Sequence, residues 1–142
     1  MISEDRKKHI YGVAKFLKEH ASEWGATQSE LEELYTLGLL HDIGYEFLEE
    51  KDYTKHEIYG GLLLKRQGYK YWKEVYYHGV ANCEYKSKYL DLLNWADMRI
   101  DSSGNEVSLD GRLEELSKRY NVPIKELYSY PIVCELKEKG FK

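Results

Sequence analysis

Two adjacent polar residues, His41 and Asp42, close an otherwise nearly apolar helical turn in the run Leu37-Gly38-Leu39-Leu40-His41-Asp42-Ile43-Gly44. Burying such a pair costs several kcal/mol unless both side chains find partners. A metal cation satisfies both at once, because it accepts a neutral imidazole nitrogen and a carboxylate oxygen. The alternative is a helix C-terminus, in which His41 interacts with the last carbonyls and Gly44 ends the helix. The dipeptide alone leaves both interpretations open.

Further candidate ligands are spread along the chain. There are five histidines, and Asp97 lies within the apolar stretch Leu92-Leu93-Asn94-Trp95-Ala96-Asp97-Met98. Zinc-finger sites take their ligands at short local spacing. Ligands drawn singly from several long elements instead indicate a site in the core of a helical bundle. The candidates, in chain order, are His9, His41, Asp42, His56, His78 and Asp97. His20 is excluded, because it suits an exposed position near a helix C-terminus.

Each of these residues also has an ordinary structural interpretation. His9 shares a helix face with Arg6 and Val13, which fits a core histidine with hydrogen-bond partners. His56 falls in the first turn of a predicted helix, where an imidazole can cap the helix or face water. His78 follows two tyrosines and fits an aromatic core contact. Asp97 has apolar neighbours, so a solvated helix face suits it poorly.

The elements that must position these residues are predicted to be helices throughout. Ser3 is a candidate N-cap, and Ser29 with Glu32 and Thr54 with Glu57 have the spacing of capping boxes. Apolar residues then recur at three-to-four spacing. The predicted helices run from Ser3 to near Trp24-Gly25, from 29 to 42, from 54 to near 68, over 70–81, over about 87–100 and over about 109–120, with shorter ones at Pro123 and Pro131. The sequence therefore predicts an all-α bundle of about six to eight helices.

Composition limits the class of protein. A chain of 142 residues suits one domain, 1–142. The net charge of −4, with both signs interspersed, gives no basic surface for nucleic acid. Cys83 and Cys134 are too few for a disulfide framework or a thiolate metal site. The N-terminus lacks the apolar core of a signal peptide, and no apolar run is long enough to span a membrane. We therefore expect a cytoplasmic protein with no membrane association.

The ordered motifs resemble the HD-domain superfamily of metal-dependent phosphohydrolases. The resemblance covers about residues 4–120, which leaves 121–142 as a C-terminal helical extension. This chain also has a segment that resembles a tail seen in some small members, namely Arg112-Leu113-Glu114-Glu115-Leu116 followed by Lys118-Arg119-Tyr120. The other motifs are Arg6-Lys7-Lys8-His9, Gly38-Leu39-Leu40-His41-Asp42-Ile43-Gly44, His56 with Gly60-Gly61, Tyr77-His78, and Trp95-Ala96-Asp97.

This resemblance implies roles for the six candidates. His9, His41, Asp42 and Asp97 correspond to the ligands of the single-metal site. His56 and His78 match the additional histidines of members that hold two metals. Because a carboxylate has two oxygens, Asp42 is the candidate that bridges two cations beside an activated water. Mixed imidazole and carboxylate ligands suit iron, manganese, cobalt, nickel or zinc.

The implied reaction is hydrolysis of a phosphate ester or anhydride, on a small phosphorylated substrate such as a nucleotide. Bacterial dinucleoside-tetraphosphate hydrolases of the superfamily have the same order of six ligands. The cations nearest to the motifs, and so the candidates for substrate binding, are Arg6, Lys55 and Arg99. The alternative for each is a solvated surface charge.

One position departs from the family pattern. Many members have a lysine, thought to contact phosphate, where this chain has Tyr45. A phenol donates a hydrogen bond but has no positive charge near neutral pH. This weakens any assignment as a cyclic-dinucleotide phosphodiesterase. Two other functions also stay open: a diiron oxygenase of the same superfamily, and a non-catalytic nucleotide-binding module.

Overall fold

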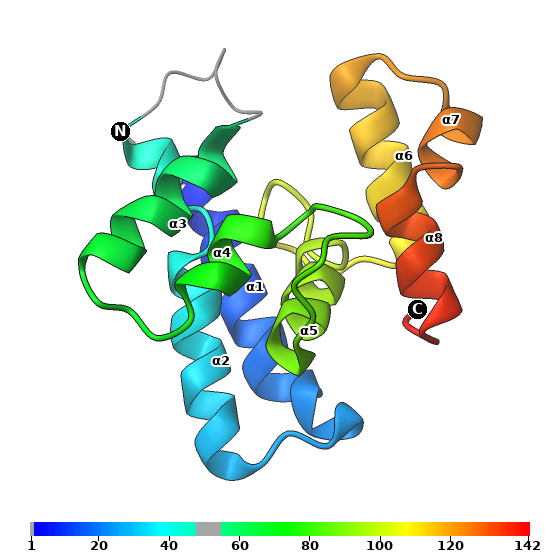
Figure 1. The fold of residues 1–142 in the computed structure, drawn as a ribbon. Helices are drawn as coiled ribbons and strands as arrows, with labels where there is room; N and C mark the ends of the chain where they lie inside the picture. Colours follow the sequence, from blue (N-terminus) through cyan, green and yellow to red (C-terminus); the bar gives the residue numbers. More distant parts are fainter. Residues whose placement is uncertain (1, 48–54) are drawn as a thin grey trace.

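Helices and loops make up the whole of the chain that the structure describes (Figure 1). The computed structural model describes residues 2–47 and 55–142. Within them there is no β-strand, and Ile100 and Glu106 form an isolated antiparallel bridge. The α-helices are α1 Glu4–His20, α2 Gln28–Leu40, α3 His56–Arg66, α4 Trp72–Tyr77, α5 Lys88–Asp97, α6 Leu109–Tyr120, α7 Ile124–Tyr128 and α8 Pro131–Glu138. The predicted all-α fold is confirmed.

Helices α1 and α2 form an antiparallel pair that places the end of α2 beside the start of α1 (Figure 1). Ser3 caps α1, as predicted, because its Oγ accepts a hydrogen bond from the backbone N–H of Arg6. The two helices approach closely at Gly38. A Cβ atom there would lie 2.6 Å from the Cα of Ala14, so only glycine allows this approach. His9 and His41 thereby face each other across the pair, with ring centroids 5.7 Å apart.

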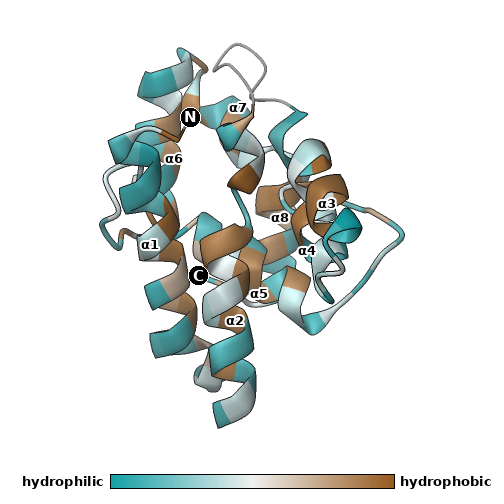
Figure 2. Cartoon of the chain, turned by 90° about the vertical axis from the view of Figure 1, so that its left-hand side faces the viewer, coloured by the Kyte–Doolittle hydropathy of each residue, from teal (hydrophilic) through white to brown (hydrophobic). Residues whose placement is uncertain are grey.

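The main hydrophobic core lies where α5 packs against α1 and α2. In Figure 2, hydrophobic residues gather in the middle of the molecule around α5, and hydrophilic residues lie at the outer ends of the helices. The largest fully buried side chains of this core are Leu17, Leu34, Leu37, Leu92 and Leu93. Burial of α5 on this core fixes Asp97, its last residue, next to α1 and α2.

Helix α3 packs against both α4 and the short 3-10 helix η2, Ile43–Glu46. Gly44 of η2 lies so close to α3 that a Cβ atom would stand 1.9 Å from the carbonyl oxygen of His56. Gly61 of α3 likewise meets the backbone of Tyr76 in α4. These two glycine contacts bring His56 and His78 up to the end of α2.

The C-terminal helices α6, α7 and α8 enclose a smaller cluster of Leu109, Leu113, Leu127 and Val133. Met98 packs against both this cluster and the main core. The ring of Phe141 stacks on Trp24 with centroids 4.0 Å apart. The C-terminal segment therefore packs on the bundle. None of the described helices has the length and apolarity needed to cross a bilayer.

Several predicted helix boundaries were wrong. The capping box of α2 is formed by Thr27 and Glu30, not by Ser29 and Glu32. Helix α2 ends at Leu40, before His41 and Asp42. Helix α3 ends at Arg66 with Gln67 as its C-cap, close to the predicted end near Gly68. The helix predicted over 70–81 is the shorter α4, because Gly79 lies in a turn with positive φ. The helix predicted over 87–100 is the shorter α5, because Met98 lies in a turn. The range 109–120 is correct, and Pro131 begins α8, whereas Pro123 is an N-cap. The predicted cap Thr54 lies outside the described residues.

Candidate metal centre

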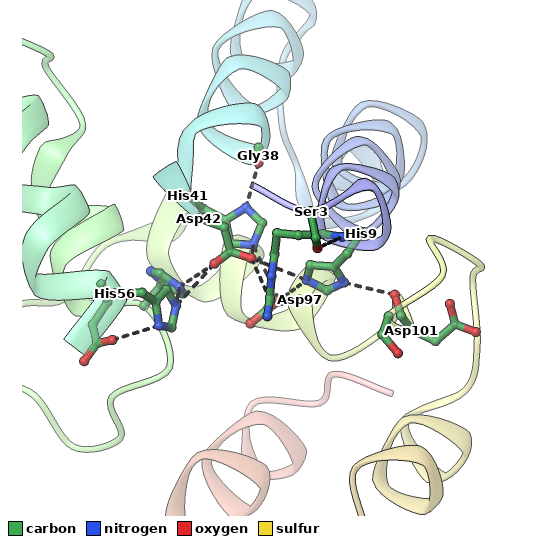
Figure 3. Close-up of polar contacts among 12 residues, drawn as sticks. Ser3, His9, Gly38, His41, Asp42, His56, Asp97 and Asp101 are labelled. Carbon is green, nitrogen blue, oxygen red and sulfur yellow. Dashed lines mark hydrogen bonds and ion pairs between the residues drawn. The ribbon is translucent and has the colours of Figure 1, made fainter. Parts of the chain in front are cut away.

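The six predicted ligands lie close together in the fold, and Figure 3 labels five of them, all but His78. His9 comes from α1, Asp97 from the end of α5, and His41 with Asp42 from the turn after α2. The first residue of α3 and the residue that follows α4 complete the set, and these are His56 and His78. Four of these six residues are buried, whereas His56 and Asp97 are partly exposed.

One group of ligand atoms surrounds the Oδ2 side of Asp42. His9 Nε2 lies 2.8 Å from Asp97 Oδ1, and His41 Nε2 lies 3.5 Å from the same oxygen. His41 Nε2 is 3.3 Å, and His9 Nε2 3.9 Å, from Asp42 Oδ2. Atoms that bind one cation at about 2.1 Å lie about 3 Å from each other. The spacing of this group therefore fits a single shared cation.

A second group lies on the other oxygen of Asp42. His56 Nε2 is 3.2 Å and His78 Nε2 is 3.5 Å from Asp42 Oδ1. The two Nε2 atoms are themselves 3.1 Å apart. Figure 3 shows the Asp42 carboxylate between His56 on one side and the group formed by His9, His41 and Asp97 on the other. The carboxylate thus has donors at both of its oxygens, and the ligand atoms of His41, Asp42 and His78 also lie within 4.8 Å of one another.

The tautomers of the histidines are set by contacts at their other ring nitrogen. His9, His41 and His78 each place Nδ1 near a backbone carbonyl oxygen, at 3.0, 2.6 and 2.6 Å. A carbonyl only accepts, so each Nδ1 donates its proton there and Nε2 is the ring nitrogen that faces the centre. His56 Nδ1 lies 3.3 Å from the Glu57 carboxylate, which acts in the same way. This arrangement of partners behind each ring is usual for metal-binding histidines.

Two features fit a cation better than an ordinary hydrogen-bond network. His41 Nε2 is buried and has no hydrogen-bond partner among the described residues. The Nε2 atoms of His56 and His78 lie 3.1 Å apart, and both are within 3.5 Å of Asp42 Oδ1, so three donor atoms converge on one point. A cation would satisfy His41 Nε2, and imidazole with carboxylate donors suits a transition metal.

The charges of the site agree with this. Burial opposes protonation of His41, but the carboxylates of Asp42 and Asp97 outweigh it and raise the pKa of His41 to about 9. Burial also favours the neutral carboxyl of Asp42, yet His41 and hydrogen bonds from His56 and His78 hold the pKa of Asp42 well below its usual range. The pKa of Asp97 is lowered in the same way, against burial, by His41 and His9. Both carboxylates are therefore anionic and available to a cation.

Comparison with protein families agrees with this geometry. The sequence model of the HD domain matches residues 6–119, which contain every ligand described above. The chain belongs to the HD-domain family. Members of this family bind divalent metals and are grouped in a superfamily of metal-dependent phosphohydrolases. No curated protein and no solved structure matches the chain.

The three cations predicted to bind substrate in this HD domain do not all lie at the centre. Arg6 lies at the centre, with Nη1 3.4 Å from Asp42 Oδ2 and its guanidinium 3.8 Å from the centre of the Tyr45 ring. Tyr45 in turn stacks on His56, with ring centroids 4.3 Å apart. Lys55 is exposed at the N-cap of α3.

Arg99 is not brought to the centre. Its Nε donates to the carbonyl oxygen of Val107 and its Nη1 to that of Lys142, both at 2.6 Å. It therefore anchors the C-terminal end of the chain. His20, excluded on sequence grounds, contacts Glu23 and Glu106 and lies apart from the six ligands.

A cavity of about 390 Å³ lies between the start of α1 and helix α6, next to the centre. Arg6 and His9 line it on one side, and Arg112 and Arg119 line it on the other. Sequence reasoning assigned no role to these two arginines. The signal available was their spacing of seven residues, which places both on one face of α6.

Proposed function

We propose that this HD domain is a phosphohydrolase with two metal ions on either side of Asp42. His9, His41, Asp97 and Asp42 Oδ2 would hold one ion, and His56, His78 and Asp42 Oδ1 the other. The observation that supports this is the division of donors between the two oxygens of a single carboxylate. Iron, manganese, cobalt, nickel and zinc all suit these donors.

The chemistry and the roles of the residues follow from this arrangement. Two such ions, when bound, lower the pKa of a water between them and polarise a phosphoryl oxygen for in-line attack. Asp42 fixes the spacing of the two positions. The backbone carbonyls and Glu57 hold the imidazoles with Nε2 facing inward. Arg6 is a cation one turn from His9 and suits an oxygen of the bound phosphoryl group.

The proposed substrate is a small phosphorylated molecule, with nucleotides as the first class to test. The cavity of about 390 Å³ beside Arg6 is within the range of small-molecule sites. Tyr45 has no charge at neutral pH, since burial raises the pKa of its phenol further. Among the described residues, the cation that contacts a proposed metal ligand is Arg6, through Asp42 Oδ2.

Metal analysis of protein purified without a chelator or a histidine tag tests the site. We expect about two transition-metal ions per chain in the wild type. His56→Ala should retain about one ion and Asp42→Ala should lose both. His20→Ala is the matched control, because this histidine lies outside the site, and it should bind as the wild type does. A content of at most one ion after reconstitution with manganese, iron, cobalt and zinc contradicts the dinuclear assignment.

Phosphate release from a panel of nucleotides, with each reconstituted metal, tests the reaction. Activity that disappears in Asp42→Ala and persists in His20→Ala supports the hydrolase. Oxygen consumption by the iron form, without phosphate release for any metal, identifies an oxygenase instead. Nucleotide binding with neither reaction identifies a binding module.

A further inference from the structure

The cavity beside the metal centre has an unusual concentration of guanidinium groups. Arg6 borders it from α1, and Arg112 and Arg119 border it from α6, two helical turns apart on one face. Asp5 is the acidic residue that lines the same cavity, and it is exposed. Positive charge therefore prevails in a space bordered by His9, a proposed metal ligand.

Arg112 is held in place and has donors to spare. Its side chain is only 9% exposed, and its Nη1 contacts the carboxylate of Glu115. Glu115 also accepts hydrogen bonds from the backbone N–H and the hydroxyl of Ser102, at 2.9 and 2.5 Å. The Nε of Arg112 is buried without a hydrogen-bond partner among the residues that the structure describes. A guanidinium has five N–H groups, so Glu115 orients Arg112 without exhausting it.

Arg119 supplies the second charge from a more open position. It is exposed and lies near the ring of Tyr120, with 5.5 Å from its Cζ to the ring centroid. A buried guanidinium held by an ion pair and an exposed one that lines the same cavity are together suited to a dianion, because each can donate charge-assisted hydrogen bonds to it.

We propose that this cavity is a second phosphoryl-binding subsite, in which Arg112 and Arg119 hold one phosphoryl group while another lies at the metal centre. The inference about the substrate rests on the proposed function, and it names the class: molecules with two separate phosphoryl groups. Anion binding by the arginines is independent of metal and of turnover.

Calorimetric titration of metal-free protein with inorganic pyrophosphate, in EDTA, tests the subsite alone. We expect Arg119→Ala to weaken binding about tenfold through loss of a charge-assisted contact. Lys118→Ala removes the neighbouring exposed cation of α6, which does not line the cavity, and should bind as the wild type does. Equal affinity in the wild type and in Arg119→Ala overturns the subsite.

Arg112→Lys keeps the charge but loses the planar fork, and we expect binding weakened several-fold. Because Arg112 is buried, the melting temperature of this variant is measured alongside. If Arg112→Lys is unfolded, the pyrophosphate affinity of Arg119→Ala alone tests the subsite.

Steady-state kinetics on the metal-loaded protein test the substrate class. Adenosine 3′,5′-bisphosphate and adenosine 5′-monophosphate form a matched pair that differs in one phosphoryl group. We expect Arg119→Ala to raise KM about tenfold for the bisphosphate, with kcat unchanged, and to leave the monophosphate unaffected. Equal effects on both substrates overturn the inference about the substrate. Absence of turnover with selective pyrophosphate binding contradicts the hydrolase and leaves the subsite in place.

Discussion

At the scale of single residues, the histidine tautomers decide which atoms face the centre. The carbonyls of Gly38 and Val75 accept from His41 and His78, and the carbonyl of Asp101 accepts from His9. Each contact turns an Nε2 atom inward. Without a cation, the carboxylates of Asp42 and Asp97 raise the pKa of His41 to about 9, against the effect of its burial.

Metal binding should therefore release protons at a pH where ordinary histidines are already neutral. At pH 8 a histidine of pKa about 6.5 is deprotonated, but His41, whose pKa is about 9, is still mostly charged. A cation must displace that proton, so we expect release of about one proton per chain and an affinity that rises with pH up to about 9. Asp42 and Asp97 contribute none, because their pKa values are lowered.

Calorimetry at pH 8 in two buffers of different ionisation enthalpy measures this release as a difference in apparent binding enthalpy. His20→Ala should give the same difference, because its imidazole lies outside the site. Binding enthalpies that are equal in both buffers would contradict a protonated His41.

The order of histidines and aspartates, together with the family resemblance, selected six residues that lie close together in the structure, and their binding of metal stays a prediction. Their orienting partners were not predictable, because backbone carbonyls are present at every position and leave no mark in the sequence. Arg112 and Arg119 were missed for a related reason. Their approach to Arg6 depends on how α6 packs, and a single sequence does not show which surfaces converge.

At the scale of elements, close contact between helices sets the distance between the ligands they contribute. Gly38→Ala tests this at the crossing of α1 and α2. The added methyl would meet backbone atoms of Ala14 at 2.6 and 2.9 Å, which cannot yield without separating the helices. We expect the free energy of unfolding to fall by about 1–3 kcal/mol or more, together with weaker metal binding as His9 and His41 move apart.

Urea denaturation and metal titration of the variant measure the two effects. Thr36→Ala is the matched control, because Thr36 is exposed on the same helix and should change stability by at most about 0.5 kcal/mol. Stability of Gly38→Ala equal to that of Thr36→Ala would show that the helices do not need this close contact.

Helix existence was predicted well from apolar spacing, but helix starts were not. Thr27 with Glu30 and Ser29 with Glu32 both match the capping-box pattern. The structure uses the first, and Glu30 also forms an ion pair with Lys88 at 3.1 Å. That contact with the start of α5 is tertiary, so local sequence could not distinguish between the two starts.

At the scale of the whole molecule, the centre joins segments that are far apart in the chain. Its ligands come from five places between His9 and Asp97, and the C-terminal segment returns to pack Phe141 on Trp24 and Trp95. Trp95 also donates its Nε1–H to the carbonyl oxygen of Lys142 at 2.9 Å. A cation at the centre would therefore cross-link the N-terminal helices with α3, α4 and α5.

Removal of metal should lower the stability of the whole fold. A ligand that binds only the folded state at about 100 times its Kd adds about 2.7 kcal/mol. For a chain of this size each kcal/mol corresponds to several degrees. We expect EDTA to lower the melting temperature of the metal-loaded protein by roughly 5–15 °C, and added manganese or iron to restore it.

Asp42→Asn separates this effect from any action of the chelator itself. The amide keeps the shape of the carboxylate but loses the anionic charge that both proposed positions share, so its melting temperature should not respond to EDTA. His56→Ala should show a reduced response, because only the position on the Oδ1 side of Asp42 is lost. A wild-type protein that holds metal by elemental analysis, yet melts at the same temperature with and without EDTA, would place that metal outside the core. The six residues would then be a buried polar network that folds without it.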